Sequence, residues 1–234
     1  MLKETDIQQV RNINKVLYDV DIVPMYGGLL CQHPYYTGMM TVDRDGSLLD
    51  LNNPEHKSRA REYIFEMIDN SSIVTLYMLI QSAYKLLWVS LCKDFLSEKD
   101  FAEYLADAWV TQENPNMDVN VTRRSSISMF RKANKQYLMT PEDYEYYMNL
   151  PEEITIWRGV SLGRVKLGLS WTDDYDKAVW FQHRFENTSD KKRGRLYQVT
   201  TPKSNILAYL NTRGEAELVT NVFKVQKDIV EVSL

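Results

Sequence analysis

The sequence predicts an α+β fold, in which a mostly helical N-terminal region over residues 1–150 precedes a mixed-β domain over residues 151–234. Apolar residues recur at spacings of three and four in the first region, whereas the last third contains short alternating or β-branched runs. The charge changes at the same place. Residues 1–150 carry 15 basic and 21 acidic side chains (−6) and residues 151–234 carry 13 and 11 (+2), which sum to the −4 of the whole chain.

The composition excludes several classes of protein. With 234 residues, 44% apolar and 12% aromatic, the chain is long enough for one large or two small packed domains and does not resemble a disordered chain. The only cysteines, Cys31 and Cys92, exclude a disulfide scaffold and favour a reducing compartment. A net charge of −4 disfavours a strongly basic nucleic-acid binder, so we expect no nucleic-acid partner.

The first region contains a series of helix signals, each of which is an N-capping residue or a run of apolar residues at helical spacing. Residues 22–53 are rich in turn signals and predict one short hairpin around Asp45-Gly46, and residues 113–120 predict a loop. We expect helices from a cap at Thr5 through Leu17, from Asn53-Pro54 onward, over the apolar run 73–95, from Ser97 through Trp109, through Ile127 to Arg131, and from Thr140-Pro141 to just before Pro151.

The apolar run 73–95 predicts a buried helix rather than a membrane span. Lys85 lies near its middle, where a lysine costs ~2.5–3.5 kcal/mol on insertion scales. The N-terminal residues contain no apolar leader, so we expect no membrane partner and a location in the cytoplasm where the protein is made, or delivery by a route that needs no leader.

Strand signals dominate after Pro151, with one helix among them. Asp173-Asp174 predicts the start of that helix, with Ala178, Phe181 and Phe185 on its inner face, and residues 186–195 predict a polar, mobile loop. We expect strands over 153–158, 167–172, 195–201, 205–209, 215–220 and 222–232.

Most conventional catalytic motifs are absent. The chain has no Walker-type phosphate loop and no GxGxxG, and its three histidines have no ligand-like spacing with the cysteines, so we expect no metal site. A Cys/His nucleophile pair stays open, although two buried, inert thiols are the simpler interpretation.

Three short stretches in the last third carry polar groups suited to ligand chemistry. Arg158 ends an apolar strand and precedes Gly159, which indicates either an exposed edge arginine or a guanidinium that binds phosphate or carboxylate where a ligand approaches the backbone. Ser170 and Thr172 share one face of a strand, with Trp171 on the other, and suit either a polar ligand or an ordinary half-buried strand end.

The third stretch is Gly214-Glu215-Ala216-Glu217-Leu218-Val219. On a strand, Glu215 and Glu217 would share one face. Strands disfavour glutamate, so the pair indicates either a solvated edge or the paired carboxylates of acid/base and glycosyl chemistry.

The order of these motifs resembles that of the R-S-E class of mono-ADP-ribosyltransferases: Arg-Gly, then Ser-x-Thr, then a helix with Ala and Phe, and finally Glu-x-Glu-Leu-Val. This class includes clostridial binary toxins and related bacterial and phage enzymes. The resemblance covers about residues 150–234 and implies an ADP-ribosyltransferase-like split-sheet domain that binds NAD as a substrate. It leaves residues 1–150 open to a docking, lid or packing role.

The resemblance implies a role for each matching residue in NAD binding. Arg158 would hold the phosphate and ribose region of NAD, and the backbone at Gly159 would bind the nicotinamide carboxamide. Ser170 would buttress the catalytic glutamate, with Thr172 beside it, and Phe181 would wall the nicotinamide pocket.

It also implies which residues act on the bond and on the acceptor. Glu217 would be the catalytic glutamate that stabilises the oxocarbenium-like centre, and Glu215 would orient or deprotonate the acceptor, which is associated with arginine acceptors. Tyr209 and Arg213 would belong to the loop that recognises the target.

The expected reaction is transfer of ADP-ribose from NAD to a protein side chain, arginine favoured, with release of nicotinamide. The same residues would serve an NAD glycohydrolase that uses water as acceptor. A third alternative is a non-catalytic binding module with a relic NAD pocket.

Overall fold

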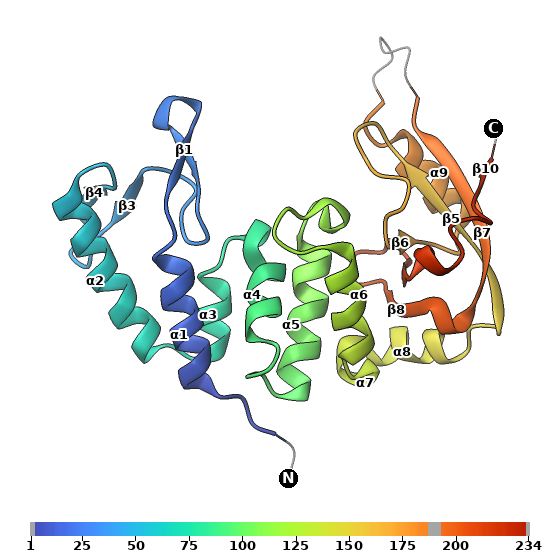
Figure 1. Cartoon of the computed structure of the whole chain (residues 1–234), viewed down its shortest axis with the longest axis horizontal. Helices are drawn as coiled ribbons and strands as arrows, with labels where there is room; N and C mark the ends of the chain where they lie inside the picture. The colour runs from blue at the N-terminus through green and yellow to red at the C-terminus, as the bar shows by residue number, and fades with distance from the viewer. Residues whose placement is uncertain (1–2, 187–192, 233–234) are drawn as a thin grey trace. The chain divides into compact units, whose positions relative to one another are not determined.

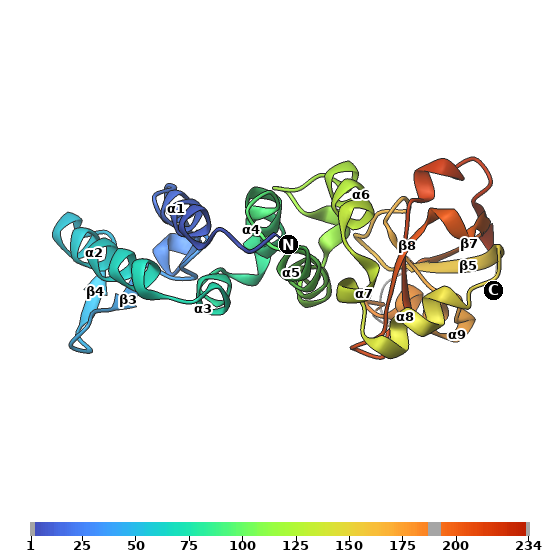
Figure 2. The same ribbon diagram turned by 90° about the horizontal axis from the view of Figure 1, so that it is seen from below.

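The computed structural model describes residues 3–186 and 193–232, and the chain forms an α+β fold of two compact units, residues 1–101 and 102–234. The division lies inside helix α5 (Glu98–Thr111), well before the expected boundary at residue 150. Helices α6 (Arg123–Lys132) and α8 (Pro141–Met148) pack against strand β8 (Ile206–Leu210), so these helices belong to the β-rich unit. Figures 1 and 2 show the elements of each unit.

The first unit combines helices with two small hairpins, and α1 packs against α2, α3 and α4. Its helices are α1 (Ile7–Tyr18), α2 (Pro54–Asn70), α3 (Ile73–Met78) and α4 (Lys85–Cys92), with 3-10 turns η1 (Tyr26–Gly28) and η2 (Ser82–Tyr84). Its strands are β1 (Val23–Met25), β2 (Leu30–Gln32), β3 (Met40–Val42) and β4 (Leu48–Asp50). The predicted hairpin around Asp45-Gly46 is confirmed as β3–β4, and the β1–β2 hairpin is an addition to it.

Helix starts follow the capping signals with one correction. Asn53 caps α2 by accepting hydrogen bonds from the backbone N–H groups of Glu55 and His56, as predicted. Asp6, not Thr5, caps α1, because its side chain directly precedes the first turn and accepts from Gln9 N at 3.1 Å. The Thr5 hydroxyl instead accepts from Ser97 N at 2.7 Å.

The apolar run 73–95 is not one helix. It is divided into α3, η2 and α4, and the break lies at Gln81, whose backbone is extended (φ −60°, ψ 143°). The N–H of Gln81 donates to Pro34 O at 2.8 Å, a tertiary partner that replaces a helical one. Among residues 3–186 and 193–232, no helix is both long and apolar enough to cross a membrane.

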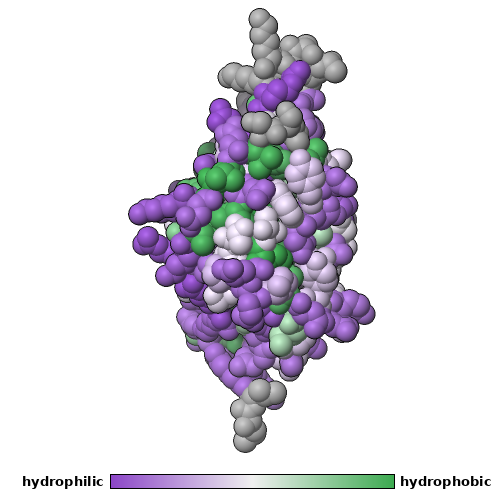
Figure 3. All heavy atoms as spheres, turned by 90° about the vertical axis from the view of Figure 1, so that its right-hand side faces the viewer, coloured by the Kyte–Doolittle hydropathy of each residue, from purple (hydrophilic) through white to green (hydrophobic). Residues whose placement is uncertain are grey.

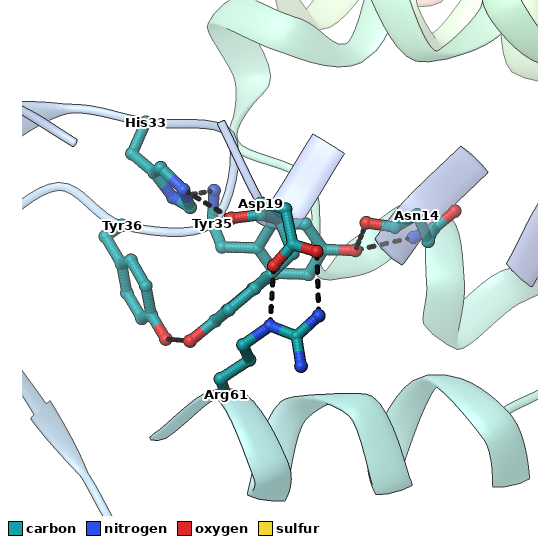
Figure 4. A network of polar contacts seen from close by, with 7 residues as sticks. Asn14, Asp19, His33, Tyr35, Tyr36 and Arg61 are labelled. Atoms are coloured by element: carbon teal, nitrogen blue, oxygen red, sulfur yellow. Dashed lines mark hydrogen bonds and ion pairs between the residues drawn. The ribbon is translucent and has the colours of Figure 1, made fainter. Parts of the chain in front are cut away.

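A buried polar network around Asn14 joins the helices of the first unit. Asn14 is fully buried; its Nδ2 donates to the Tyr35 hydroxyl at 2.9 Å and to Leu76 O at 3.0 Å. Trp88 Nε1 donates to Asn14 Oδ1 at 2.7 Å, so α1, α3 and α4 share one amide. Figure 4 shows the Asn14–Tyr35 contact in this network.

His33 extends the polar core beside Tyr35. Its Nδ1 accepts from Tyr35 N at 3.1 Å, so Nε2 carries the proton and donates to Tyr18 O at 3.0 Å. Burial lowers the pKa of His33, which keeps the ring neutral in this position. Nearer the surface, Arg61 donates two hydrogen bonds to Asp19, as Figure 4 shows.

The second unit contains both three-stranded sheets. Its remaining helices are α7 (Lys135–Leu138) and α9 (Tyr175–His183), with 3-10 turns η3 (Pro115–Met117), η4 (Lys203–Asn205) and η5 (Val222–Lys224). Its other strands are β5 (Glu153–Val160), β6 (Ser170–Trp171), β7 (Arg195–Pro202), β9 (Glu217–Thr220) and β10 (Val230–Val232). The face drawn in Figure 3 is largely hydrophilic, with small apolar areas among the hydrophilic side chains.

The two sheets have the orders β10-β7-β5 and β6-β9-β8, and their strand pairs are antiparallel. A bridge between Trp157 and Thr172 connects them, with N–H to O distances of 2.7 and 2.9 Å. Helix α9 packs on β5, and β5 and β7 run side by side in Figure 2.

Several predicted strands are shorter than expected. Within the predicted strand 167–172 only β6 forms, and within 215–220 only β9 forms. The run 222–232 begins as η5, turns through the Asp228 N to Val225 O hydrogen bond, and forms only β10 at its end. Most of the predicted mobile loop 186–195 lies outside the described residues.

We predict that Asn14→Ala lowers the free energy of unfolding by about 2–4 kcal/mol, because it removes the buried amide that accepts from Trp88 N–H and donates to Leu76 C=O. Urea denaturation followed by circular dichroism measures this loss. Asn12→Ala is the matched control, because Asn12 lies on the same helix and is exposed. Equal effects of the two substitutions would contradict the role of the network.

Candidate active site

A pocket in the second unit collects the three predicted motifs. Its walls come from α5 and the segment after it, β5, β6, α9 and the turn before β9. The predicted site residues that line it are Arg158, Gly159, Ser170, Thr172, Phe181, Arg213, Glu215 and Glu217.

Arg158 is buried rather than exposed at a strand edge. The residue is only 8% exposed. Its guanidinium donates to Ser170 O and to Val165 O, the latter at 3.2 Å. Burial lowers the pKa of Arg158 to about 10, with the Glu217 charge acting in the opposite direction. The guanidinium therefore stays positively charged at neutral pH inside the second unit.

Two glycines make this arrangement possible. A Cβ on Gly168 would lie 2.2 Å from Arg158 Nη2, so only glycine leaves room for the guanidinium. A Cβ on Gly159 would lie 1.9 Å from Ala178 O on α9. Gly159 is therefore required by the close approach of α9 to β5, a different reason from the predicted approach of a ligand.

Ser170 is held between two polar side chains. Asn116 Nδ2 donates to Ser170 Oγ at 2.7 Å, and the Ser170 hydroxyl hydrogen-bonds the Glu217 carboxylate. Since a hydroxyl has one proton, Ser170 accepts from Asn116 and donates to Glu217. Thr172 is buried, and its Oγ1 accepts from Asp174 N at 3.1 Å, so it shapes the turn that leads into α9.

Glu217 begins β9 and faces donors from two elements. Trp109 Nε1, on α5, donates to Glu217 Oε1 at 2.8 Å, in addition to the Ser170 hydroxyl. Burial is the largest influence and raises the pKa of Glu217; the neighbouring Glu215 charge acts in the same direction. The two hydrogen bonds and the Arg158 charge act the other way, and the net pKa is raised.

Glu215 does not share a strand face with Glu217. Strand β9 begins at Glu217, and Ala216 has a left-handed backbone (φ 48°) that a residue with a side chain rarely adopts. Asn211 Oδ1 accepts from Ala216 N at 2.9 Å and holds this turn. The turn, not strand alternation, brings both carboxylates to the pocket.

At the pocket edge, Glu215 pairs with a guanidinium of the same chain. Arg213 Nη2 lies 3.4 Å from Glu215 Oε1, and Arg213 Nη1 donates to Val110 O at 2.7 Å. Both side chains are partly exposed.

Tyr209 does not line the pocket. It lies on β8, whose residues are all buried, and its ring stacks on Tyr146 with centroids 4.2 Å apart. The predicted role of Tyr209 in target recognition therefore has no support from its placement, because its side chain belongs to the core between β8 and α8.

The structure adds pocket residues that no motif indicated. Trp109 has the pattern of a core residue on an apolar helix, and Asn116 lies in a predicted loop, so neither carries a local signal. Arg164 and Arg184 each lie over the Phe185 ring at 5.2 Å, which gives the pocket a positively charged and aromatic edge. Phe185 is 43% exposed there, which corrects its predicted place on the inner face of α9.

Other candidate chemistry is absent from the described residues. Within 3–186 and 193–232, no group of His, Cys, Asp or Glu could hold a metal ion. Cys31 and Cys92 are free and buried, and burial raises the pKa of both thiols, which disfavours the reactive thiolate.

Comparison of the chain with models of protein families, with curated proteins and with solved structures gave no match. The chemistry of the pocket therefore stands on its own geometry. It combines a buried guanidinium, a carboxylate fixed by two donors, and a second carboxylate at the edge. Such a set can stabilise positive charge that develops on a ligand and can orient a cationic or protic acceptor.

We predict that Glu217→Gln raises the melting temperature at pH 8 by about 2–5 °C. The raised pKa of Glu217 means that ionising this group costs stability in the folded state. Because the cost disappears as the carboxylate becomes protonated, the difference from the wild type should shrink as the pH falls toward 4. Calorimetry between pH 4 and 8 measures it.

Glu152→Gln is the control for this titration, because Glu152 is an exposed carboxylate of the same unit. A Glu217→Gln difference that does not vary with pH, or that grows on acidification, would contradict the raised pKa.

Proposed function

We propose that this chain is an NAD-dependent mono-ADP-ribosyltransferase that moves ADP-ribose from NAD to a protein side chain, arginine favoured, and releases nicotinamide. The observation that carries the proposal is that Arg158, Ser170 and Glu217, from three separate stretches, line one pocket. In this pocket the Ser170 hydroxyl is hydrogen-bonded to the Glu217 carboxylate. We place its action in the cytoplasm of the producing cell or of a host.

The reaction breaks the bond between the anomeric carbon of the nicotinamide ribose and the ring nitrogen. Nicotinamide leaves as a neutral molecule, and positive charge develops on the anomeric carbon, as in glycoside hydrolysis. An ionised Glu217 would stabilise this charge. Its carboxylate is held in advance by Trp109 and Ser170, so little reorganisation accompanies the reaction.

The arginines of the pocket fit the phosphates of NAD. Arg158 keeps its charge while buried, and Arg164 and Arg184 place two more guanidinium groups at the edge. A diphosphate carries the complementary charge, and arginine binds phosphate oxygens with paired hydrogen bonds. No metal is needed for this step, because the leaving group already carries positive charge in NAD.

The pair formed by Arg213 and Glu215 favours an arginine acceptor. In this pair Glu215 already lies beside a guanidinium, at 3.4 Å, while it lines the pocket next to Glu217. An arginine of a target protein could take the place of Arg213 on this carboxylate, and Glu215 would orient it or accept its proton as the new bond forms to the anomeric carbon.

We predict that incubation with labelled NAD and a cell lysate, supplemented with a simple guanidine compound, transfers label to a protein or to the guanidine. Glu217→Gln should reduce nicotinamide release by about 100-fold or more, because the charge-stabilising group is lost. Glu215→Gln should retain cleavage of NAD and lose transfer. Glu152→Gln, an exposed carboxylate outside the pocket, should match the wild type.

Two other results would replace the proposal. Free ADP-ribose without any labelled acceptor would favour the glycohydrolase, with water in place of the guanidinium. NAD that is neither cleaved nor bound by the wild type would leave the binding module as the function.

A further inference from the structure

We propose that Trp109 and Asn116 are positioning residues of this site: the indole N–H of Trp109 orients the Glu217 carboxylate, and the Asn116 amide orients the Ser170 hydroxyl. The proposal rests on the proposed function and deepens it. It assigns a role to residues 109–116, which lie outside all three motifs and more than forty residues before the first of them.

Trp109 is a rigid donor. It is 1% exposed, and its ring meets Phe130 edge-on, with centroids 5.1 Å apart and planes at 90°. The indole has a single N–H and no acceptor, so a fixed ring has a fixed donor direction. That direction leads to Glu217 Oε1 at 2.8 Å. This hydrogen bond to Glu217 distinguishes Trp109 from a residue that only packs in the core.

Asn116 orients Ser170, which is the second donor to the Glu217 carboxylate. Its Oδ1 accepts from the backbone N–H of Leu169, which orients the amide and leaves Nδ2 to donate to Ser170 Oγ at 2.7 Å. Because Asn116 occupies an acceptor site of the hydroxyl, the Ser170 proton is free to point at Glu217. The segment from α5 through η3 thus fixes both donors of the carboxylate.

Both charged groups and neutral donors influence the ionisation of Glu217, and removal of the Trp109 donor would change only one of them. Arg158 faces it from β5 and favours the ionised carboxylate, whereas Glu215 in the preceding turn disfavours it. The neutral donors Trp109 and Ser170 both favour the ionised form. Loss of the Trp109 donor should therefore make Glu217 harder to ionise, with the charges left in place.

Trp109→Phe tests this directly, because it keeps an aromatic ring against Phe130 and removes the N–H. We predict that kcat for NAD cleavage at pH 7 falls roughly tenfold, as for other supporting hydrogen bonds of an active site, while KM changes little. The acid limb of the pH profile should move to higher pH. A residue that served only packing would lower the melting temperature without moving this limb.

A second readout does not require activity. In protein labelled with ¹³C at the glutamate carboxyl carbon, the Glu217 resonance is the one absent from Glu217→Gln, and its titration should shift to higher pH in Trp109→Phe. Trp88→Phe is the matched control: it also removes a buried indole N–H, bonded to Asn14 in the first unit, and should leave the Glu217 titration unchanged.

Asn116→Asp is the second variant, should Trp109→Phe fold poorly. It keeps the oxygen that accepts from Leu169 and replaces the donor with an acceptor, so the Ser170 proton should turn away from Glu217. We expect a lower kcat with little change in KM.

The outcomes separate this inference from the function on which it rests. A wild type that cleaves NAD, beside variants with its kcat, pH profile and Glu217 titration, would overturn the positioning roles alone. A wild type that does not cleave NAD would overturn the proposed function, and the glutamate titration would still decide whether Trp109 controls the ionisation of Glu217.

Discussion

The buried guanidinium of Arg158 is the constraint on which the second unit depends. A charge out of water is costly unless its donors find partners. Backbone carbonyls of Ser170 and Val165 accept from Nη1 and Nη2 of Arg158, whereas its buried Nε has no partner among the described residues. Arg158 belongs to the β5 sheet and Ser170 to the β6 sheet, so one side chain links the two. The absence of a side chain at Gly168 follows from the same burial, since any Cβ there would overlap the guanidinium.

Glu217 supplies the opposite charge in the same pocket, at a cost to stability. Burial disfavours its ionised form, yet an ionised carboxylate is what the proposed chemistry requires. Trp109 and Ser170 offset part of that cost with hydrogen bonds. The left-handed backbone of Ala216, a local strain typical of functional sites, places Glu215 beside it without a regular strand.

The compact units show why the helices around the pocket cannot be separated from the sheets. Helix α5 provides Trp109, and α6 and α8 cover β8, so a domain boundary at residue 150 would cut through one core. The first unit has a core of its own, centred on the amide of Asn14, where helices are joined by polar contacts in addition to apolar packing. Each unit thus contains a buried polar group whose partners come from several elements.

By itself, the sequence determined the α+β class, most helix starts, the β3–β4 hairpin and the three motif stretches, because caps, turns and side-chain periods act within a few residues. Only the tertiary structure decided the burial of Tyr209, the packing reason for Gly159 and the turn that separates Glu215 from β9. One of the two donors to Glu217 is Trp109, 108 residues earlier in the chain. Contacts at such separation depend on how whole elements pack, and no local pattern in the chain encodes them.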